Sequence, residues 1–209
     1  MSPGATWAAV LATLALLALY ELGVALAHRR RPERMARTAH ASLREEWFAA
    51  VSAQPGSEIL AVQTLRNSLM SATMTASTAV LGLMGTVTLA APSLHASLGE
   101  AQAGAFHLTP RLALELMLLT LLFASLAASA MAVRYYNHVG FIAAMPVGSP
   151  ARARWAAPGA AYVRRAGLLY SWGLRHLVLV APPPAALAVV AVLALGFDRF
   201  GSGAAGAPA

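Results

Sequence analysis

Residues 63–92 read QTLRNSLMSATMTASTAVLGLMGTVTLAAP and contain a single charged side chain, Arg66. Small or hydroxyl-bearing residues recur in this stretch at alternating steps of three and four, a spacing that places them along one face of a helix. These residues, which we call the helix-packing seam, are Ser68, Ser71, Thr75, Thr78, Gly82 and Gly85. In lipid, such a seam lets another backbone approach closely and offers hydroxyl groups for hydrogen bonds between helices. The stretch therefore predicts the packing core of a helical membrane protein.

The composition supports a membrane protein. Of the 209 residues, 58% are hydrophobic and 11% are charged, less than half of the ~25% charged residues in soluble domains. The chain has no cysteine, which excludes disulfides, thiolate nucleophiles and zinc fingers. It has no lysine either, which excludes Schiff-base chemistry and a P-loop lysine. The formal charge of +7 comes from Arg residues beside apolar stretches, so the positive-inside rule explains it better than a nucleic-acid partner does.

Four stretches are long and apolar enough to cross a membrane. They cover about residues 5–27, 67–92, 111–133 and 177–197. Most Arg residues lie in the intervening segments 28–66 and 134–176, which we assign to the cytoplasm. The sequence thus predicts an all-α bundle of four spans in one membrane domain, residues 1–200, with both termini outside the cytoplasm and a flexible tail, residues 201–209.

Shorter signals refine this prediction. An apolar residue recurs every four residues at Met35, Ala39, Leu43, Trp47 and Val51. This predicts an amphipathic helix on the inner membrane surface or against the cytoplasmic ends of the spans. The second span should end near Pro92, and the third should start at Pro110 with an outer loop between them. Residues 146–161 are rich in Pro, Gly and Ala and predict a cytoplasmic loop.

Two further features concern how the spans pack. Ser125 and Ser129 are four residues apart in the third span, which predicts close contact with another helix. Three consecutive prolines, residues 182–184, must kink or break the fourth span because they remove three backbone donors.

Several short motifs resemble one family. The run Gln63-Thr64-Leu65-Arg66-Asn67-Ser68, followed by a Thr/Ala/Ser-rich span, is similar to the central motif of a bacterial and plant membrane family called domain of unknown function 599. Arg44-x-x-Trp47, Arg134-x-x-Asn137-His138-x-Gly140-Phe141 and Gly173-x-Arg175 are also similar. The resemblance covers about residues 20–195. It implies a multispanning protein, which we place in the bacterial inner membrane, and no established activity.

Polar residues gather at the predicted inner ends of the four spans, at a similar depth if the spans form a bundle. This predicted polar cluster comprises Glu21, Gln63, Arg66, Asn67, Arg134, Asn137, His138, Arg175 and His176. An ionisable group near hydrocarbon needs a partner or a wet cavity, and we expect Glu21 to pair with Arg66 or Arg134. The cluster could bind a solute, an ion or a lipid headgroup through Arg. The alternative, which we favour, is a structural cluster that locks the bundle.

The inventory gives no support to catalysis. The six His are dispersed without an i, i+4 pair, so we expect no metal and no cofactor. There is no nucleophile elbow, phosphate loop or pair of catalytic carboxylates. Glu115 in the third span is best explained as the partner of Arg111, four residues earlier. We therefore expect no enzyme activity.

These patterns favour a non-enzymatic structural or assembly subunit in the lipid bilayer. Four spans enclose little space, so we expect a homo-oligomer or a complex with other membrane subunits. The alternative is a small oligomeric channel or carrier, lined by the hydroxyls of the seam together with Arg66 and Arg134.

Overall fold

A computed structural model describes residues 3–30, 35–102, 108–180, 183–194 and 198. All six elements in these residues are helices, which confirms the all-α prediction; the predicted tail, residues 201–209, lies outside them. The helices are α1 (Pro3–Arg30), α2 (Ala36–Ala53), α3 (Glu58–Gln102), α4 (Pro110–Ala144), α5 (Pro150–Val178) and α6 (Pro183–Val192). Three of them, α1, α3 and α4, are long and apolar enough to cross a membrane, which indicates a membrane-embedded protein.

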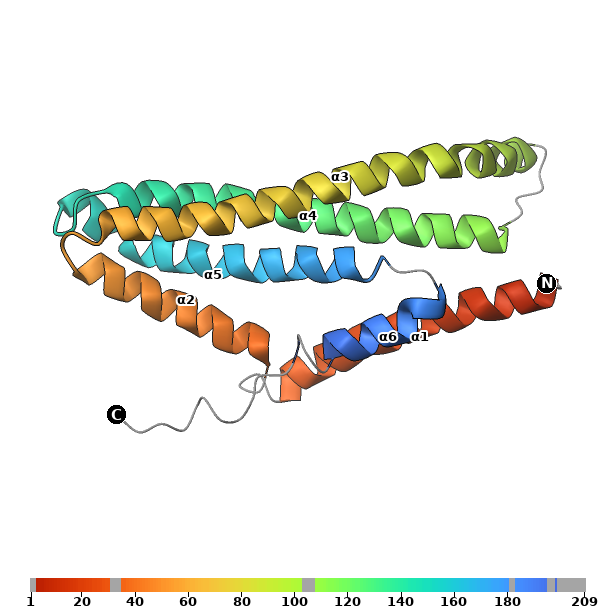
Figure 1. The fold of residues 1–209 in the computed structure, drawn as a ribbon, viewed down its shortest axis with the longest axis horizontal. Helices are drawn as coiled ribbons and strands as arrows, with labels where there is room; N and C mark the ends of the chain where they lie inside the picture. The colour runs from red at the N-terminus through yellow and green to blue at the C-terminus, as the bar shows by residue number, and fades with distance from the viewer. Residues whose placement is uncertain (1–2, 31–34, 103–107, 181–182, 195–197, 199–209) are drawn as a thin grey trace.

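The three longest helices form one side of the molecule. Helices α3, α4 and α5 run side by side in alternating directions, and α2 packs across α5 (Figure 1). Helices α1 and α6 pack together beneath the other half of this layer. The end of α1 lies close to the start of α2. Helix α2 lies toward one end of the molecule, and the end of α3 and the start of α4 lie at the other.

Helix α3 is longer than the sequence predicts. We expected it to end near Pro92, but it continues through this proline to Gln102. A proline removes only one backbone hydrogen bond of the helix, and Pro92 is exposed, so its ring displaces no packed neighbour. Helix α4 begins at Pro110 as predicted, and Thr109 caps it by accepting a hydrogen bond from the Leu112 N–H at 3.1 Å.

The predicted loop at residues 146–161 is wrong for most of its length. Helix α5 begins at Pro150, because Ser149 caps it by accepting from the Arg152 N–H at 3.2 Å and proline suits the first helical position. Pro158 lies within the helix. The predicted fourth span, residues 177–197, is not one helix either. Helix α5 ends at Val178 and α6 begins at Pro183, so this segment forms two helices and not one kinked helix.

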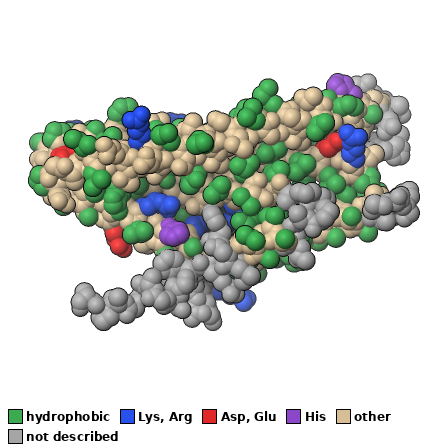
Figure 2. Space-filling model, in the orientation of Figure 1, with side chains coloured by type: hydrophobic (Ala, Val, Ile, Leu, Met, Phe, Trp, Pro, Cys, Tyr) green, Lys and Arg blue, Asp and Glu red, His purple; other side chains and the backbone are tan. Residues whose placement is uncertain are grey.

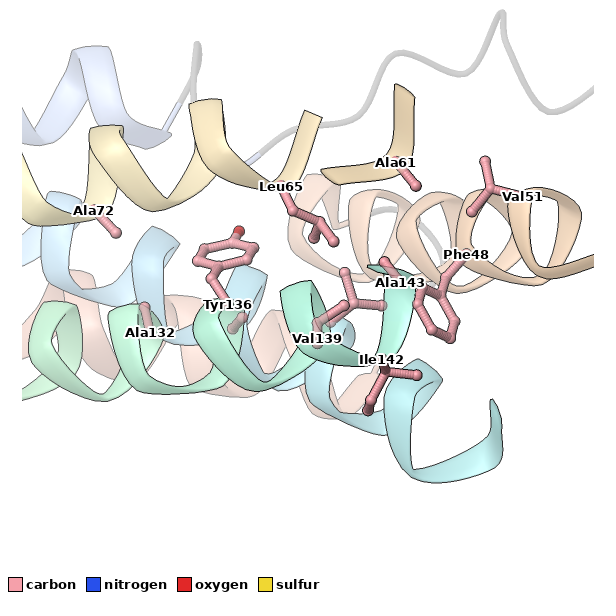
Figure 3. Packing of buried hydrophobic residues seen from close by; sticks show 12 residues of the cluster. Phe48, Val51, Ala61, Leu65, Ala72, Ala132, Tyr136, Val139, Ile142 and Ala143 are labelled. Carbon is pink, nitrogen blue, oxygen red and sulfur yellow. The ribbon is translucent and has the colours of Figure 1, made fainter. Parts of the chain in front are cut away.

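The main hydrophobic core lies where α2 meets α3, α4 and α5 (Figure 3). Phe48 and Val51 of α2 contact Ala61 and Leu65 of α3 within a cluster that continues along α4 and α5. The remaining buried members are Ala72, Ala132, Tyr136, Val139, Ile142, Ala143, Val163 and Ala166. Small residues make up much of this core, and they allow the helices to approach closely.

Glycines of α5 mark the closest helix contacts. Gly173 packs on Ser129, and the Ser125 hydroxyl donates to the Gly173 carbonyl at 2.7 Å. This confirms the predicted close packing of Ser125 and Ser129. Six residues earlier on α5, a Cβ on Gly167 would lie 2.5 Å from the Arg44 guanidinium. Helix α5 therefore packs against α4 on one side and against α2 on the other.

Candidate polar site at the junction of four helices

A buried ion pair lies where α1, α5 and the end of α6 meet. The Arg175 guanidinium contacts the Asp198 carboxylate directly, and the side chains of Arg175 and Asp198 are only 3% and 7% exposed. The Tyr20 hydroxyl of α1 donates to the other carboxylate oxygen at 2.6 Å. Leu179 and Leu193 pack beside Tyr20 and close this site with apolar side chains.

The backbone of Asp198 extends the same connection. Its N–H donates to the Leu193 carbonyl at 2.9 Å, and its carbonyl accepts from the Ala36 N–H at 3.2 Å. Ala36 is the first residue of α2. Asp198 thus joins α1, α2, α5 and α6, and the end of the described chain lies beside the start of α2.

Two more charged groups complete the site. Arg37 of α2 interacts electrostatically with Arg175, Asp198 and Glu21. Burial, together with repulsion from Arg175, lowers the pKa of Arg37, but a guanidinium stays charged at neutral pH. We call these five residues, Tyr20, Glu21, Arg37, Arg175 and Asp198, the junction cluster. It contains two cations and two carboxylates, so its formal charges balance.

The junction cluster contains only two members of the predicted polar cluster, Glu21 and Arg175. The Glu21 carboxylate has one buried oxygen without a partner, and the structure pairs Glu21 with neither Arg66 nor Arg134. His176 stays near the junction but packs its ring on Trp172. The other predicted members are exposed on α3 and α4 and are not brought to the junction: Gln63, Arg66, Asn67, Arg134, Asn137 and His138.

The helix-packing seam divides between two faces of α3. Thr75 is buried, and Ser68 and Gly82 are half-buried, with Gly82 against Leu122 of α4. Ser71, Thr78 and Gly85 are exposed. The buried face also includes Leu65, Ala72 and Ala79, which lie between the rows of the seam. Alanine therefore contributes as much to this contact as the hydroxyl-bearing residues do.

Each seam hydroxyl is already bonded within α3. The donors and acceptors are four residues apart, as for Ser71 to the Asn67 carbonyl at 3.1 Å and Thr78 to the Met74 carbonyl at 2.9 Å. Ser68 and Thr75 bond in the same way. Hydroxyls that donate to their own helix need no water partner, so the seam does not require a hydrated path.

A second buried Arg closes the end of the molecule that holds α2. Arg152 is 2% exposed. Its guanidinium donates to the Ala143 and Met145 carbonyls at 2.6 Å each and to the Val51 carbonyl at 3.3 Å. These carbonyls belong to the ends of α4 and α2, so one side chain satisfies the last turns of two helices. The sequence placed Arg152 in a loop and gave it no such role.

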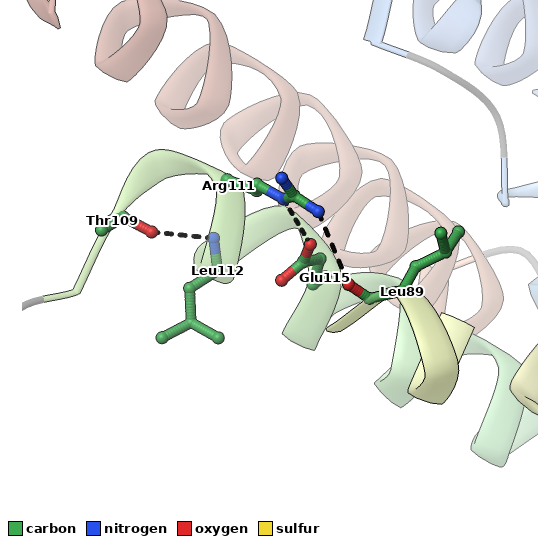
Figure 4. Close-up of polar contacts among 5 residues, drawn as sticks. All are labelled: Leu89, Thr109, Arg111, Leu112 and Glu115. Carbon is green, nitrogen blue, oxygen red and sulfur yellow. Dashed lines mark hydrogen bonds and ion pairs between the residues drawn. The ribbon is translucent and has the colours of Figure 1, made fainter. Parts of the chain in front are cut away.

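The third polar site lies at the other end of the molecule (Figure 4). The Arg111 Nε–H donates to Glu115 Oε1 at 2.7 Å, which confirms the predicted pair. Arg111 also reaches the Leu89 carbonyl of α3 at 3.5 Å. The second Glu115 oxygen is buried without a partner. Among the described residues, no group of three or more His, Asp or Glu side chains could hold a metal ion.

Comparison with known proteins identifies the family. A family model described as "Protein of unknown function, DUF599" matches residues 8–194. The chain belongs to this family. The match covers every member of the junction cluster except Asp198. The comparisons of this DUF599 chain with curated proteins and with solved structures found no match.

Sequence reasoning missed Asp198, which holds the DUF599 junction together. Asp198 is the only aspartate of the chain and follows the last apolar stretch. A lone acid beyond a proline-broken apolar segment is a signal for a partner within the fold. Arg175 was the available partner, because the residues on either side of it, 166–174 and 176–197, carry no charge.

Proposed function

We propose that the chain is a non-enzymatic membrane subunit that crosses the bilayer three times and carries a hairpin that enters the membrane and returns. The crossings are α1 and parts of α3 and α4, and the hairpin is the end of α5 with α6. The contacts of Asp198 with Arg175, Tyr20 and Ala36 carry this proposal. In these contacts, the charged groups at membrane level hold helices together and do not line an open channel.

The same contacts support the hairpin. If α6 completed a fourth crossing, Asp198 would lie on the side of the membrane opposite to the start of α2. Instead, Asp198 is hydrogen-bonded to Ala36, and it is paired with Arg175 of α5. A chain that leaves Arg175 and returns to it after 23 residues has reversed direction. The break between α5 and α6 is the place where it does so.

Helix length supports a large cytoplasmic part. The 45 residues of α3 extend over about 67 Å, at 1.5 Å per residue, whereas the hydrocarbon core is ~30 Å thick. Helix α2 carries exposed polar side chains such as His40, Ser42 and Glu46 and cannot lie in hydrocarbon. We therefore place α2, with the adjacent halves of α3, α4 and α5, in the cytoplasm, and the junction cluster at the inner boundary.

The distribution of charged and hydrophobic side chains on the surface supports this position in the membrane. On the face shown in Figure 2, basic and His side chains gather over the part that contains α2 and α5. The α3–α4 surface beyond it carries patches of hydrophobic side chains and no charged ones up to an acidic–basic pair and a His side chain near the far end. Exposed apolar residues of α3 in this part are Val80, Leu81, Met84, Val87 and Leu89. The Arg residues that follow α1 support a cytoplasmic position for the α2 side.

Labelling of single cysteines tests the topology, because the natural chain has none. We expect Ser42→Cys and a cysteine added after Ala209 to react with a membrane-impermeant maleimide only after cells are permeabilised. His95→Cys, near the α3–α4 turn, should react in intact cells. Reaction of the C-terminal cysteine in intact cells would instead support a fourth crossing, with both termini outside.

Assembly is the second part of the proposed function. The exposed row Ser71, Thr78 and Gly85 leaves space beside α3, since a Cβ on Gly85 would meet nothing within 4 Å. We expect a second copy of the chain, or another membrane subunit, to occupy this face. The channel alternative has less support because the seam hydroxyls are bonded within their own helix.

Native mass spectrometry in mild detergent tests the assembly. We expect a species of two or more chains, and Gly85→Leu should reduce it because the bulky side chain blocks a close approach. Gly23→Leu, on helix α1 and also without neighbours within 4 Å, is the matched control because it lies outside this row. A monomer at all detergent and protein concentrations would exclude self-assembly, and co-purification of another membrane protein would point to a mixed complex.

A further inference from the structure

A face of aromatic and basic side chains lies along α4 and α5, away from the junction cluster. The Tyr162 ring of α5 lies 5.5 Å from the Tyr135 ring and 6.1 Å from the His138 ring of α4, measured between centroids. Arg134 lies one turn from His138, and Arg165 lies about one turn from Tyr162. Because α4 and α5 are antiparallel, these two turns lie at the same level. We call Arg134, His138, Tyr162 and Arg165 the basic face.

Among the described residues, the two guanidinium groups of the basic face have no acidic partner. Arg134 and Arg165 are both exposed, and the described part of the chain contains no carboxylate within ion-pair distance of either. Arg164, the neighbour of Arg165, differs because it lies 3.7 Å from Glu45 of α2. Two unpaired Arg side chains at one level attract an anion, and guanidinium binds phosphate with two parallel hydrogen bonds.

The surface next to the basic face is apolar. On α4, Phe123, Ala127 and Met131 precede Arg134 at helical spacing on the same side of the helix; Phe123 is 63% exposed and Met131 is 40% exposed. On α5, the exposed Trp172 lies two turns beyond Arg165 in the same direction and packs against His176. Tryptophan is enriched at the membrane interface. Along this face, Arg side chains that can bind phosphate come first, an interfacial Trp follows, and apolar side chains come last. A phospholipid presents its phosphate, glycerol and acyl chains in the same order.

We propose that the basic face binds one anionic phospholipid of the inner leaflet. Arg134 and Arg165 hold the phosphate, and the Tyr162 hydroxyl adds a further donor. The acyl chains lie along Met131 and Phe123. This inference rests on the proposed position of the bilayer, because that position sets Trp172 at the inner interface and the basic face at the level of the phosphates.

Retention of defined lipids tests the site. The purified protein is incubated in mild detergent with phosphatidylglycerol or phosphatidylcholine, and bound lipid is counted by native mass spectrometry. We expect the natural chain to retain phosphatidylglycerol preferentially. Arg134→Gln with Arg165→Gln should weaken this binding about thirtyfold, on the scale of ~1 kcal/mol for each Arg near an anionic surface.

Two controls separate the site from general charge and from folding. Arg154→Gln with Arg164→Gln removes the same number of charges from the cytoplasmic part and should leave binding within about twofold, since neither belongs to the basic face. Arg134→Lys with Arg165→Lys should keep most of the preference for the anionic lipid. Equal losses in both Gln pairs, or equal retention of the two lipids by the natural chain, would overturn the proposal. Cysteine labelling reports topology without lipid counting, so failure of the lipid site and failure of the topology can be told apart.

Discussion

Replacing Asp198 with alanine is expected to lower the free energy of unfolding by about 3–5 kcal/mol, because it leaves the Arg175 guanidinium buried without its partner. The same change removes the acceptor of the Tyr20 hydroxyl. Thermal unfolding in mild detergent measures the loss. Since α6 is held to α1 through this residue, limited proteolysis should also cut the C-terminal segment sooner in Asp198→Ala than in the natural chain.

Two variants show whether the ion pair or the packing is responsible. Tyr20→Phe removes one hydrogen bond and should cost about 1–2 kcal/mol. Arg175→Met combined with Asp198→Leu removes both charges and should recover much of the stability lost in Asp198→Ala, because no unpaired charge remains. If Asp198→Ala unfolds at the same temperature as the natural chain, the junction cluster does not hold the hairpin, and the proposed topology loses its main support.

Replacing Arg152 with alanine should have the second largest effect, a loss of about 3 kcal/mol, because three buried carbonyls lose a charged donor. The affected carbonyls close the ends of α4 and α2, so unfolding should begin in the part of the molecule that holds α2. Hydrogen exchange should show faster exchange in residues 36–53 and 136–145 than in α1.

Arg154→Ala is the matched control for this experiment. Arg154 lies two residues away on the same helix and is exposed, so its loss should change stability by less than about 0.5 kcal/mol. Equal effects of the two changes would show that the contacts of Arg152 contribute no more than general charge does.

Helix type and the long apolar segments could be predicted because they depend on local sequence. The apolar runs in α1, α3 and α4 show where these helices lie, and Pro110 marks the start of α4 by its fixed backbone angle. The same local reasoning failed at residues 150–161. It treated Pro, Gly and Ala as loop residues, whereas Pro150 is at a first helical position and the glycines of α5 make room for neighbouring helices.

Composition could not distinguish the predicted fourth span from the hairpin that we propose. Residues 177–197 are apolar enough to cross a membrane, and a returning hairpin has the same composition as a crossing helix. The choice between a crossing helix and a hairpin depends on two contacts. Arg175 contacts Asp198, 23 positions later, and Asp198 contacts Ala36. No local pattern encodes either contact.

Most of the junction cluster was missed for a related reason. The sequence gathered polar residues by their position relative to the predicted span ends, which assumes equal spans that end at one level. In the structure, α3 and α4 extend well past the junction, so Arg66 and Arg134 lie far along these helices and not beside Glu21. Arg175 was found because it lies at the predicted inner end of the fourth span.

The run of prolines has a consequence for biogenesis. Proline has no N–H, so the first residues of α6 present fewer unsatisfied donors than an ordinary helix start would. In the proposed topology, the tip of the hairpin can therefore enter lipid without a protein partner, and no charged residue after Arg165 has to be translocated.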